Sequence, residues 1–470
     1  MTQIKRQKNL TTGALLPQIL IYALPMMATS ILQHLFNTAD MIVVGRWGGD
    51  TAEECAIALA AVGSCAALIN LFVNCFIGFS TGAGICVAHD IGAGHEDEVH
   101  KTVHTAITIS FIVGAIVTML GMFASGPVLY LMGTDATVLP QATAYMRAYF
   151  CGIPALMLYN FCASILRSKG DTVRPMIFLT IGGVTNALFN LFAVIVLRWG
   201  AVGVGAATAL SQWVACLLIV IYMLRMDGPC RLQPRALRIH VHSLKRIVTI
   251  ALPAGFNSIF FALSNMAIQT SVNEFGPTVV AGNTAGSNLD NYIYSCQNAF
   301  YHASMTFVAQ NKGAQKPDRI KKSIFYSSLS SVSVGFAVGL IFWIFAPSLL
   351  TIYAPDNPAV VDAGYTRMTI LCLTYFLCGL MEIGTGALRG MGKSMLPTIV
   401  TLIGTCALRV IWSFILTSWL IPVLPTTTGL ILLYVAYPVT WLITSATQFI
   451  LCAVVLRKYK RKLETEAQPI

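Results

Sequence analysis

Charged side chains are rare within the long apolar segments of this 470-residue sequence, and those that occur there are the best candidates for chemistry. They are Asp40, Arg147, Asp290, Arg367, Glu382 and Arg409. An ionised group in the hydrocarbon of a bilayer costs at least about 2.5–3.5 kcal/mol, so such residues face protein or water and predict function. A carboxylate in that setting can take up and release a cation.

Asp40 is the strongest candidate because it belongs to a polar stripe. Gln33, Asn37 and Asp40 are spaced i, i+4 and i+7, which places them on one face of a helix. Asn186 and Asn190, spaced i, i+4 on a later segment, could line the same cavity and donate hydrogen bonds to Asp40. Two alternatives stay open: Asp40 could lie at the outer interface, and the two amides could serve only to join helices.

We expect a substrate cleft or polar site formed by residues of the C-terminal half together with Gln33, namely Asp290, Tyr294, Glu382, Arg409 and Gln33. Asp290 and Tyr294 are spaced i, i+4 and share a helix face. Glu382 and Arg409 lie on two other segments, and an ion pair between them would reduce the cost of burying both charges. That pair could serve function or structure alone.

The sequence repeats itself about half its length apart. Residues 165–175 (ILRSKGDTVRP) and 387–397 (ALRGMGKSMLP) share Leu-Arg, Gly and Pro at identical spacing. Two further pairs keep the same order: ALP at 23–25 and 251–253, and residues 92–103 and 313–324. Arg147 and Arg367 also occupy related places, early in their segments, where we expect both side chains to reach the interface. Internal repeats in a strongly apolar chain are typical of secondary transporters.

Composition indicates the class of protein in which these residues occur. Hydrophobic residues make up 56% of the chain, charged residues only 10%, and the mean hydropathy is +0.72, which is typical of an all-α integral membrane protein. Twelve segments are long enough to span a bilayer, near 17–44, 56–88, 102–124, 137–166, 175–197, 201–224, 246–273, 278–310, 324–346, 359–388, 397–421 and 429–456.

Six spans per repeat is an even number, so the two repeats are parallel. We therefore expect an N-terminal lobe over residues 1–226, a cytoplasmic linker over 227–244, a C-terminal lobe over 245–457 and a cytoplasmic tail over 458–470.

Lysine and arginine predict the orientation. With the N-terminus inside, 25 of the 30 basic residues lie in cytoplasmic ends and connections, and only Arg46 and Arg198 lie outside. We therefore expect a multi-pass protein of the cell membrane with both termini cytoplasmic. The net charge of +11 favours contact with anionic lipid headgroups over binding of nucleic acid. Thirteen cysteines without metal-type spacing predict buried, inert thiols.

These features resemble the multidrug and toxic compound extrusion (MATE) transporters, over nearly the whole chain and most of all their prokaryotic DinF-like branch. The matching motifs are Leu-Pro near the start of the first and seventh spans, Asn37-x-x-Asp40 followed by Gly45, Gln310-Asn311-x-Gly313, and the paired LRxxG motif. The resemblance implies two six-helix lobes around a central cleft, with export in exchange for H⁺ or Na⁺.

The resemblance also implies roles for single residues. Asp40 matches the aspartate implicated in cation coupling, and Pro25 matches the proline at which the first helix bends. Asn190 stands where the branch often has a second aspartate, which puts a two-carboxylate site in doubt. The acids of the NorM-like branch correspond to Phe261 and Cys378, so we expect that coupling site to be absent.

The sequence thus predicts multidrug efflux by a cation antiporter that is not an enzyme. We expect Asp40, Asn37, Asn186 and Asn190 to bind the coupling ion, H⁺ or Na⁺, with no cofactor and no metal other than Na⁺ at Asp40. Interior acids outnumber the deeper base Arg409, which favours lipophilic, cationic cargo, and we expect a monomer. The alternatives are a flippase for lipid-linked precursors and, remotely, a membrane-embedded enzyme. No HExxH or P-loop motif occurs in the spans, and the GxSxG match at residues 78–82 (GFSTG) lies within a long apolar segment and not at a strand-to-helix turn.

Overall fold

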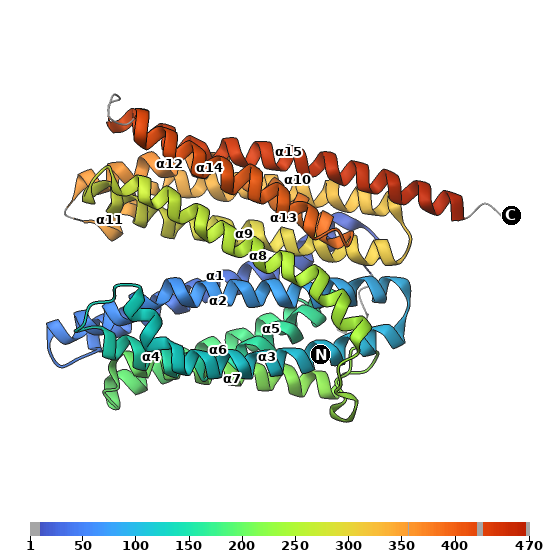
Figure 1. The fold of residues 1–470 in the computed structure, drawn as a ribbon, viewed down its shortest axis with the longest axis horizontal. Helices are drawn as coiled ribbons and strands as arrows, with labels where there is room; N and C mark the ends of the chain where they lie inside the picture. The colour runs from blue at the N-terminus through green and yellow to red at the C-terminus, as the bar shows by residue number, and fades with distance from the viewer. Residues whose placement is uncertain (1–9, 356, 421–425, 467–470) are drawn as a thin grey trace. The chain divides into compact units, whose positions relative to one another are not determined.

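The computed structural model describes residues 10–355, 357–420 and 426–466, and it shows a bundle of long helices joined by short connections (Figure 1). The predicted cytoplasmic ends at residues 1–9 and 467–470 lie outside the described residues.

The N-terminal half contains α1 (Leu15–Trp47), α2 (Ala52–Ala93), α3 (Glu96–Leu131), α4 (Leu139–Phe150), α5 (Ile153–Ser168), α6 (Val173–Leu191), η1 (Phe192–Val196) and α7 (Gly200–Arg225). A short 3₁₀ turn, η2 (Pro234–Ala236), lies in the linker. The C-terminal half contains α8 (Val241–Asn273), α9 (Pro277–Gly313), α10 (Pro317–Ile344), α11 (Ala346–Tyr353), α12 (Pro358–Gly390), α13 (Met395–Thr401), η3 (Leu402–Ala407), α14 (Leu408–Ile415), η4 (Leu416–Leu420) and α15 (Thr426–Glu466).

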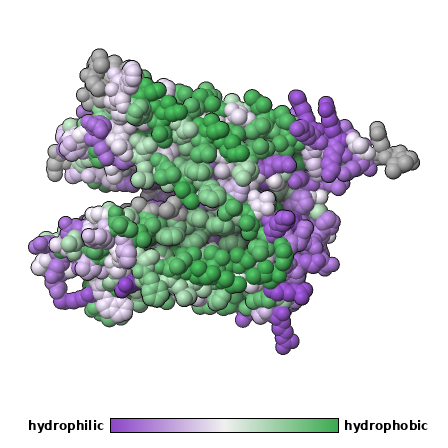
Figure 2. Space-filling view, viewed as in Figure 1, coloured by the Kyte–Doolittle hydropathy of each residue, from purple (hydrophilic) through white to green (hydrophobic). Residues whose placement is uncertain are grey.

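Most of these helices have the length and composition of membrane spans. Among the described residues ten helices meet both conditions, and α4 with α5, bent by 44°, make an eleventh span. The remaining long helix, α9, has 37 residues, and its polar side chains lower its mean hydropathy. Large apolar side chains such as Phe111, Leu120 and Phe123 are exposed, and hydrophobic residues cover the flanks of the helices while hydrophilic residues gather toward their ends (Figure 2). This distribution suits a protein whose solvent is lipid.

The helices extend beyond the predicted spans, and some are irregular. The predicted fourth span, 137–166, is two helices that meet at Cys151 and Gly152. Three segments, η1, η3 and η4, have π-helical hydrogen bonding. Such turns are rare and often occur at functional sites. They fall in the fifth and eleventh predicted spans, at the positions that follow Asn190 and flank Arg409.

The chain forms two compact units. Of the described residues, unit 1 comprises 28–91 and 95–251, and unit 2 comprises 10–27, 92–94, 252–355, 357–420 and 426–466. Helices α1 and α8 therefore each contribute to both units, and the change occurs within three residues of Pro25 and Pro253. A proline removes one intrahelical hydrogen bond, so these are the points where each helix bends most easily. The lobe limits drawn from the sequence remain a prediction.

Specific contacts hold residues 10–13, which precede α1, in unit 2 and the start of α8 in unit 1. In unit 2 the Arg319 guanidinium donates to the backbone carbonyl groups of Leu10, Thr12 and Gly13 at 2.7–3.4 Å. In unit 1 the start of α8 is held by Arg246, whose two terminal nitrogens lie 2.7 and 3.0 Å from the carboxylate of Asp90. Charge-assisted bonds of this kind are about twice as strong as neutral ones.

Candidate functional site

The carboxylate of Asp40 lies at the centre of a small polar cluster in unit 1. Asp40 on α1 is only 9% exposed, and Asn190 on α6 is fully buried. The amide nitrogen of Asn190 donates to Asp40 Oδ1 at 2.6 Å. The side-chain amide of Asn186, one turn earlier on α6, also faces the carboxylate. With its nitrogen turned toward Asp40, as the hydrogen-bond partners require, that nitrogen lies 2.8 Å from Oδ1 and 3.3 Å from Oδ2.

A third helix completes the cluster through a residue that sequence reasoning missed. With Asn186 turned in this way, its amide oxygen faces the Thr208 hydroxyl on α7 at 3.3 Å. The single hydrogen of that hydroxyl can go either to this oxygen or to the carbonyl oxygen of Val204 at 3.0 Å. A threonine in an apolar helix usually makes only the second of these bonds. Nothing in the spacing of Thr208 distinguished it from the other hydroxyls of the spans.

Two adjacent glycines bring the three helices together. A Cβ atom on Gly182 of α6 would lie 2.9 Å from the carbonyl oxygen of Ser211 on α7. A Cβ atom on Gly183 would lie only 2.0 Å from the ring of Phe36 on α1. One glycine therefore admits α7 and the next admits α1, so that Asn186 and Asn190 can meet Asp40 in the following turns.

The chemistry of this cluster suits a monovalent cation. Asp40 interacts with the two amides and with no basic side chain of the described residues, so its negative charge has no protein counter-charge. The second amide atom of Asn190, Oδ1, is buried without a hydrogen-bond partner. A proton on Asp40, or a Na⁺ held by oxygens of the carboxylate, the amides and Thr208, would neutralise the site. Among the described residues no group of three His, Cys, Asp or Glu could hold a transition metal.

The other members of the predicted stripe do not join this cluster. Gln33 and Asn37 are exposed on α1, and neither makes a hydrogen bond to Asp40 among the described side chains. Asp40 itself is buried against protein in unit 1, which is compatible with either depth of this residue in the bilayer. The prediction that Asn186 and Asn190 contact Asp40 is confirmed, and their role in binding a cation remains a prediction.

Unit 2 contains a different kind of polar site, a buried ion pair. The Arg367 guanidinium on α12 donates to Asp290 Oδ2 on α9 from Nε at 3.0 Å and from Nη2 at 2.7 Å. It also donates to Asn283 Oδ1 at 2.8 Å, and that oxygen accepts a further bond from the Tyr434 hydroxyl. Arg367 is 5% exposed and Asp290 2%. The expectation that Arg367 reaches the interface is therefore wrong, because α9 supplies a buried carboxylate directly opposite it.

The related residue of the first repeat, in contrast, is exposed, and its place at the interface remains a prediction. Arg147 on α4 is exposed, and its Nε donates to the backbone carbonyl of Met122. The two arginines thus have the same place in the repeat and opposite environments.

The predicted ion pair between Glu382 and Arg409 is also wrong. Arg409 on α14 is 1% exposed, and its Nε donates to the Thr440 hydroxyl at 3.0 Å. Its guanidinium lies over the rings of Tyr437 and Trp441, with centroid distances of 4.4 and 5.7 Å. These aromatic faces of α15 take the place of the carboxylate.

Glu382 lies on α12 and is 8% exposed, without a hydrogen bond or ion pair to any described side chain. Tyr294 on α9, 37% exposed, is close enough to Glu382 to interact with it electrostatically. The structure therefore brings these two predicted residues together and leaves Glu382 as the second carboxylate without a basic partner in hydrogen-bond contact.

Comparison with known proteins agrees with this architecture. The MatE family pattern matches residues 25–192 and again 253–415, so the chain belongs to the MatE family, and the two matches coincide with the two repeats. The chain is 25% identical over 408 residues to the "probable multidrug resistance protein YoeA" of Bacillus subtilis, covering 85% of this chain and 86% of the relative. It is 25% identical to a "FAD transporter" of Shewanella oneidensis, covering 78% and 80%.

Among solved structures, an outward-facing multidrug resistance MATE family transporter of the MOP superfamily has a TM-score of 0.88 at 20% identity, covering 97% of this chain and 99% of the other. The fold is therefore the twelve-helix MATE fold, with α9 as the span that hydropathy alone does not identify. The protein is a multi-pass membrane transporter of the multidrug efflux class.

Proposed function

We propose that this transporter exports lipophilic, cationic small molecules across the cell membrane in exchange for H⁺ or Na⁺, by alternating access around a central cleft. The observation that carries the proposal is the Asp40 cluster: a buried carboxylate with two amide partners and no basic partner among the described residues. Burying that charge unpaired is costly, so the site favours occupation by a cation.

The same cluster offers ligands for either of two cations, H⁺ or Na⁺. The amide nitrogens facing Asp40 suit an ionised carboxylate, which accepts hydrogen bonds. Binding of Na⁺ would favour rotation of the amides so that their oxygens face the ion. An ion drives alternation only if it binds the two states of the transporter with different affinity. Pro25 on the same helix is the point at which α1 would respond to that change.

The proposed cargo follows from charges that the structure leaves unpaired. Asp290 is neutralised by Arg367 and no longer counts toward an acidic interior. Glu382 has Arg389, which is also buried, as an electrostatic neighbour, and Arg409 is a further buried base. Asp40 is the described interior carboxylate on which no basic side chain acts, and its charge supports a cationic cargo. The Shewanella relative is named for a different cargo, FAD, so a range of cargo charges should be assayed. We further propose that the chain works as a monomer with both termini cytoplasmic, as its basic connections indicate.

Transport by the purified protein in proteoliposomes tests the proposal. A proton gradient and a Na⁺ gradient are imposed separately, and movement of a fluorescent lipophilic cation is followed. We expect one of the two gradients to drive cargo against its concentration. Cargo movement that neither gradient changes would contradict antiport, and transfer of a lipid-linked precursor without a gradient would favour the flippase alternative.

A further inference from the structure

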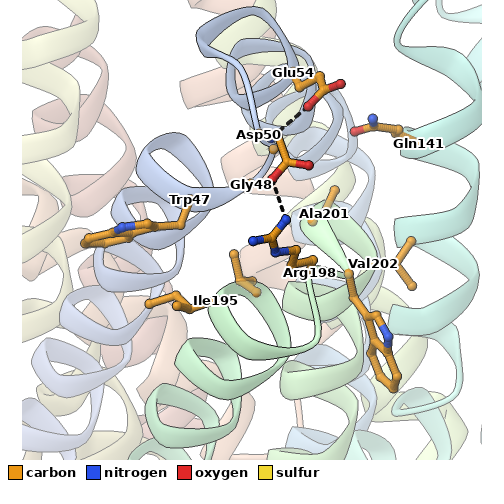
Figure 3. A pocket seen from close by; sticks show the side chains of 13 residues that line it. Trp47, Gly48, Asp50, Glu54, Gln141, Ile195, Arg198, Ala201 and Val202 are labelled. Atoms are coloured by element: carbon orange, nitrogen blue, oxygen red, sulfur yellow. Dashed lines mark hydrogen bonds and ion pairs between the residues drawn. The ribbon is translucent and has the colours of Figure 1, made fainter.

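Unit 1 has a cavity of about 500 Å³ beyond the end of α1 that follows Asp40 (Figure 3). It is formed where the α1–α2 connection, α2, α4, η1 and the start of α7 meet. Residues that bear on its chemistry are Trp47, Asp50, Glu54, Gln141, Val194 and Arg198. The cavity is large enough for several waters and hydrated ions.

The cavity carries a small excess of negative charge. Arg198 donates to Asp50 at 3.0 Å, and both side chains are 74% exposed, so this pair is hydrated. Glu54 accepts the backbone N–H groups of Asp50 and Thr51 at 2.7 and 3.3 Å, and no basic side chain pairs with it among the described residues. Gln141 on α4 extends its side chain toward Glu54 and Asp50 (Figure 3), and its Oε1 atom is buried without a hydrogen-bond partner. Two carboxylates and a free amide oxygen against one arginine favour cations over anions.

A single apolar layer separates this cavity from the Asp40 cluster. Val44 follows Asp40 by four residues on α1, and Val194 follows Asn190 by four residues in the middle of η1. Four helical residues rise about 6 Å, so each valine lies one turn further along than its polar partner. Val44 is fully buried and Val194 is 1% exposed, and Val194 also contributes to the cavity wall.

The third side of the layer has a hydroxyl group. On α4, Gln141 lines the cavity and Tyr145 follows it one turn later. Tyr145 is 6% exposed and interacts electrostatically with Asp40. Gly205 on α7 lets the two backbones approach here, since a Cβ atom on it would lie 2.8 Å from the Tyr145 carbonyl oxygen. Val44, Val194 and Tyr145 belong to the same buried cluster, and the phenol hydroxyl is the polar group among the three.

We infer that this cavity is the vestibule through which the coupling cation reaches Asp40, and that Tyr145 is the positioning residue of its last step. The inference rests on the proposed role of Asp40 as the coupling carboxylate. The vestibule concentrates cations by its net charge, and the layer of Val44, Val194 and Tyr145 closes it from the cluster. A proton, or a Na⁺ that exchanges its waters, passes beside the phenol oxygen, which can accept or donate a hydrogen bond.

Adjacent residues of η1 provide a matched pair for a blocking experiment. Ile195 lines the cavity and Val196, 64% exposed, does not. In a transport-competent variant whose native cysteines are replaced, Ile195→Cys and Val196→Cys are treated from outside with a positively charged methanethiosulfonate, which adds a fixed cation. We expect labelled Ile195→Cys to lose gradient-driven transport about tenfold or more, equivalent to about 1.4 kcal/mol in barrier height, and labelled Val196→Cys to change little. Equal transport by the two labelled variants would overturn the inference.

A conservative variant tests the role of the phenol. Tyr145→Phe keeps the ring that closes the layer and removes the hydroxyl, and Tyr149→Phe is the control, one turn further along the same helix. We expect Tyr145→Phe to slow the approach of the cation to its site, measured as the relaxation rate after a rapid jump in pH or Na⁺, by about tenfold, while equilibrium cation affinity stays near that of Tyr149→Phe. Unchanged relaxation in Tyr145→Phe would contradict the inference.

The two failures can be told apart. If Asp40→Asn keeps full gradient-driven transport, the proposed function fails whatever the vestibule does. If Asp40→Asn loses coupling while labelled Ile195→Cys and Tyr145→Phe both behave as their controls, the proposed function stands and the vestibule is refuted.

Discussion

Replacing Arg367 by methionine should destabilise unit 2 far more than the same change at the related Arg147. Arg367→Met removes three donors at once: two to Asp290, at 2.7 and 3.0 Å, and one to Asn283, at 2.8 Å. It leaves a carboxylate that is 2% exposed and whose Oδ1 already has no hydrogen-bond partner. A stranded buried charge of this kind costs about 3–5 kcal/mol.

The matched control comes from the internal repeat. Arg147 is exposed and donates a hydrogen bond to one backbone carbonyl, that of Met122, so Arg147→Met should cost no more than about 1 kcal/mol. The double variant Asp290→Leu/Arg367→Met removes both charges. It should recover most of the lost stability, because apolar side chains of similar size can replace a buried pair at little cost.

Thermal unfolding of the purified variants in detergent measures these differences. For a unit of roughly 150–250 residues, 1 kcal/mol shifts Tm by about 2–4 °C. Arg367→Met should therefore lower Tm by roughly 6–20 °C, with Arg147→Met within about 4 °C of the parent. The reasoning is refuted if the two single variants unfold together, or if the double variant is less stable than Arg367→Met.

Three other changes test separate contacts. Gly183→Ala should displace the Phe36 ring from α6 and reduce transport, and adding Phe36→Ala should restore transport. The control Val184→Ala, at a position 49% exposed, should have little effect. Failure of the double variant to recover would contradict the packing described. Glu382→Gln and Arg409→Met should have effects on stability that add to within about 0.5 kcal/mol because the residues are not paired, and double-mutant coupling above that would show contact. Single cysteines at Thr2 and Gln468, both beyond the described residues, should react only with reagents that cross the membrane, and labelling of either from outside would contradict the topology.

The helices were predictable because length and apolar content decide them. A span needs about 20 apolar residues, and this chain has them in regular succession. The contact of Asp40 with Asn186 and Asn190 was also predictable, since i, i+4 spacing puts both amides on one face and a buried carboxylate needs donors. The π-helical turns were not, because an extra residue per turn arises from packing against neighbouring helices and leaves no composition signal.

Errors arose where a side chain has two possible partners. Arg367 was assigned to the interface from its place early in the helix, but its direction is decided by Asp290, 77 residues away. Arg409 was assigned to Glu382 as an opposite charge, whereas the rings of Tyr437 and Trp441 surround it. A helical pattern fixes the face of a residue and carries no information about which helix that face meets.

Gradient-driven export by Asp40→Asn in proteoliposomes is the most direct test of the coupling role of Asp40. The substitution is nearly isosteric and removes the negative charge that the two amides contact, so the variant should fold and reach the membrane. We expect the variant still to bind cargo and to lose transport against a concentration gradient, with no remaining dependence on the imposed pH or Na⁺ gradient. Export at the parent rate, with the same dependence on pH and Na⁺, would remove Asp40 from the mechanism.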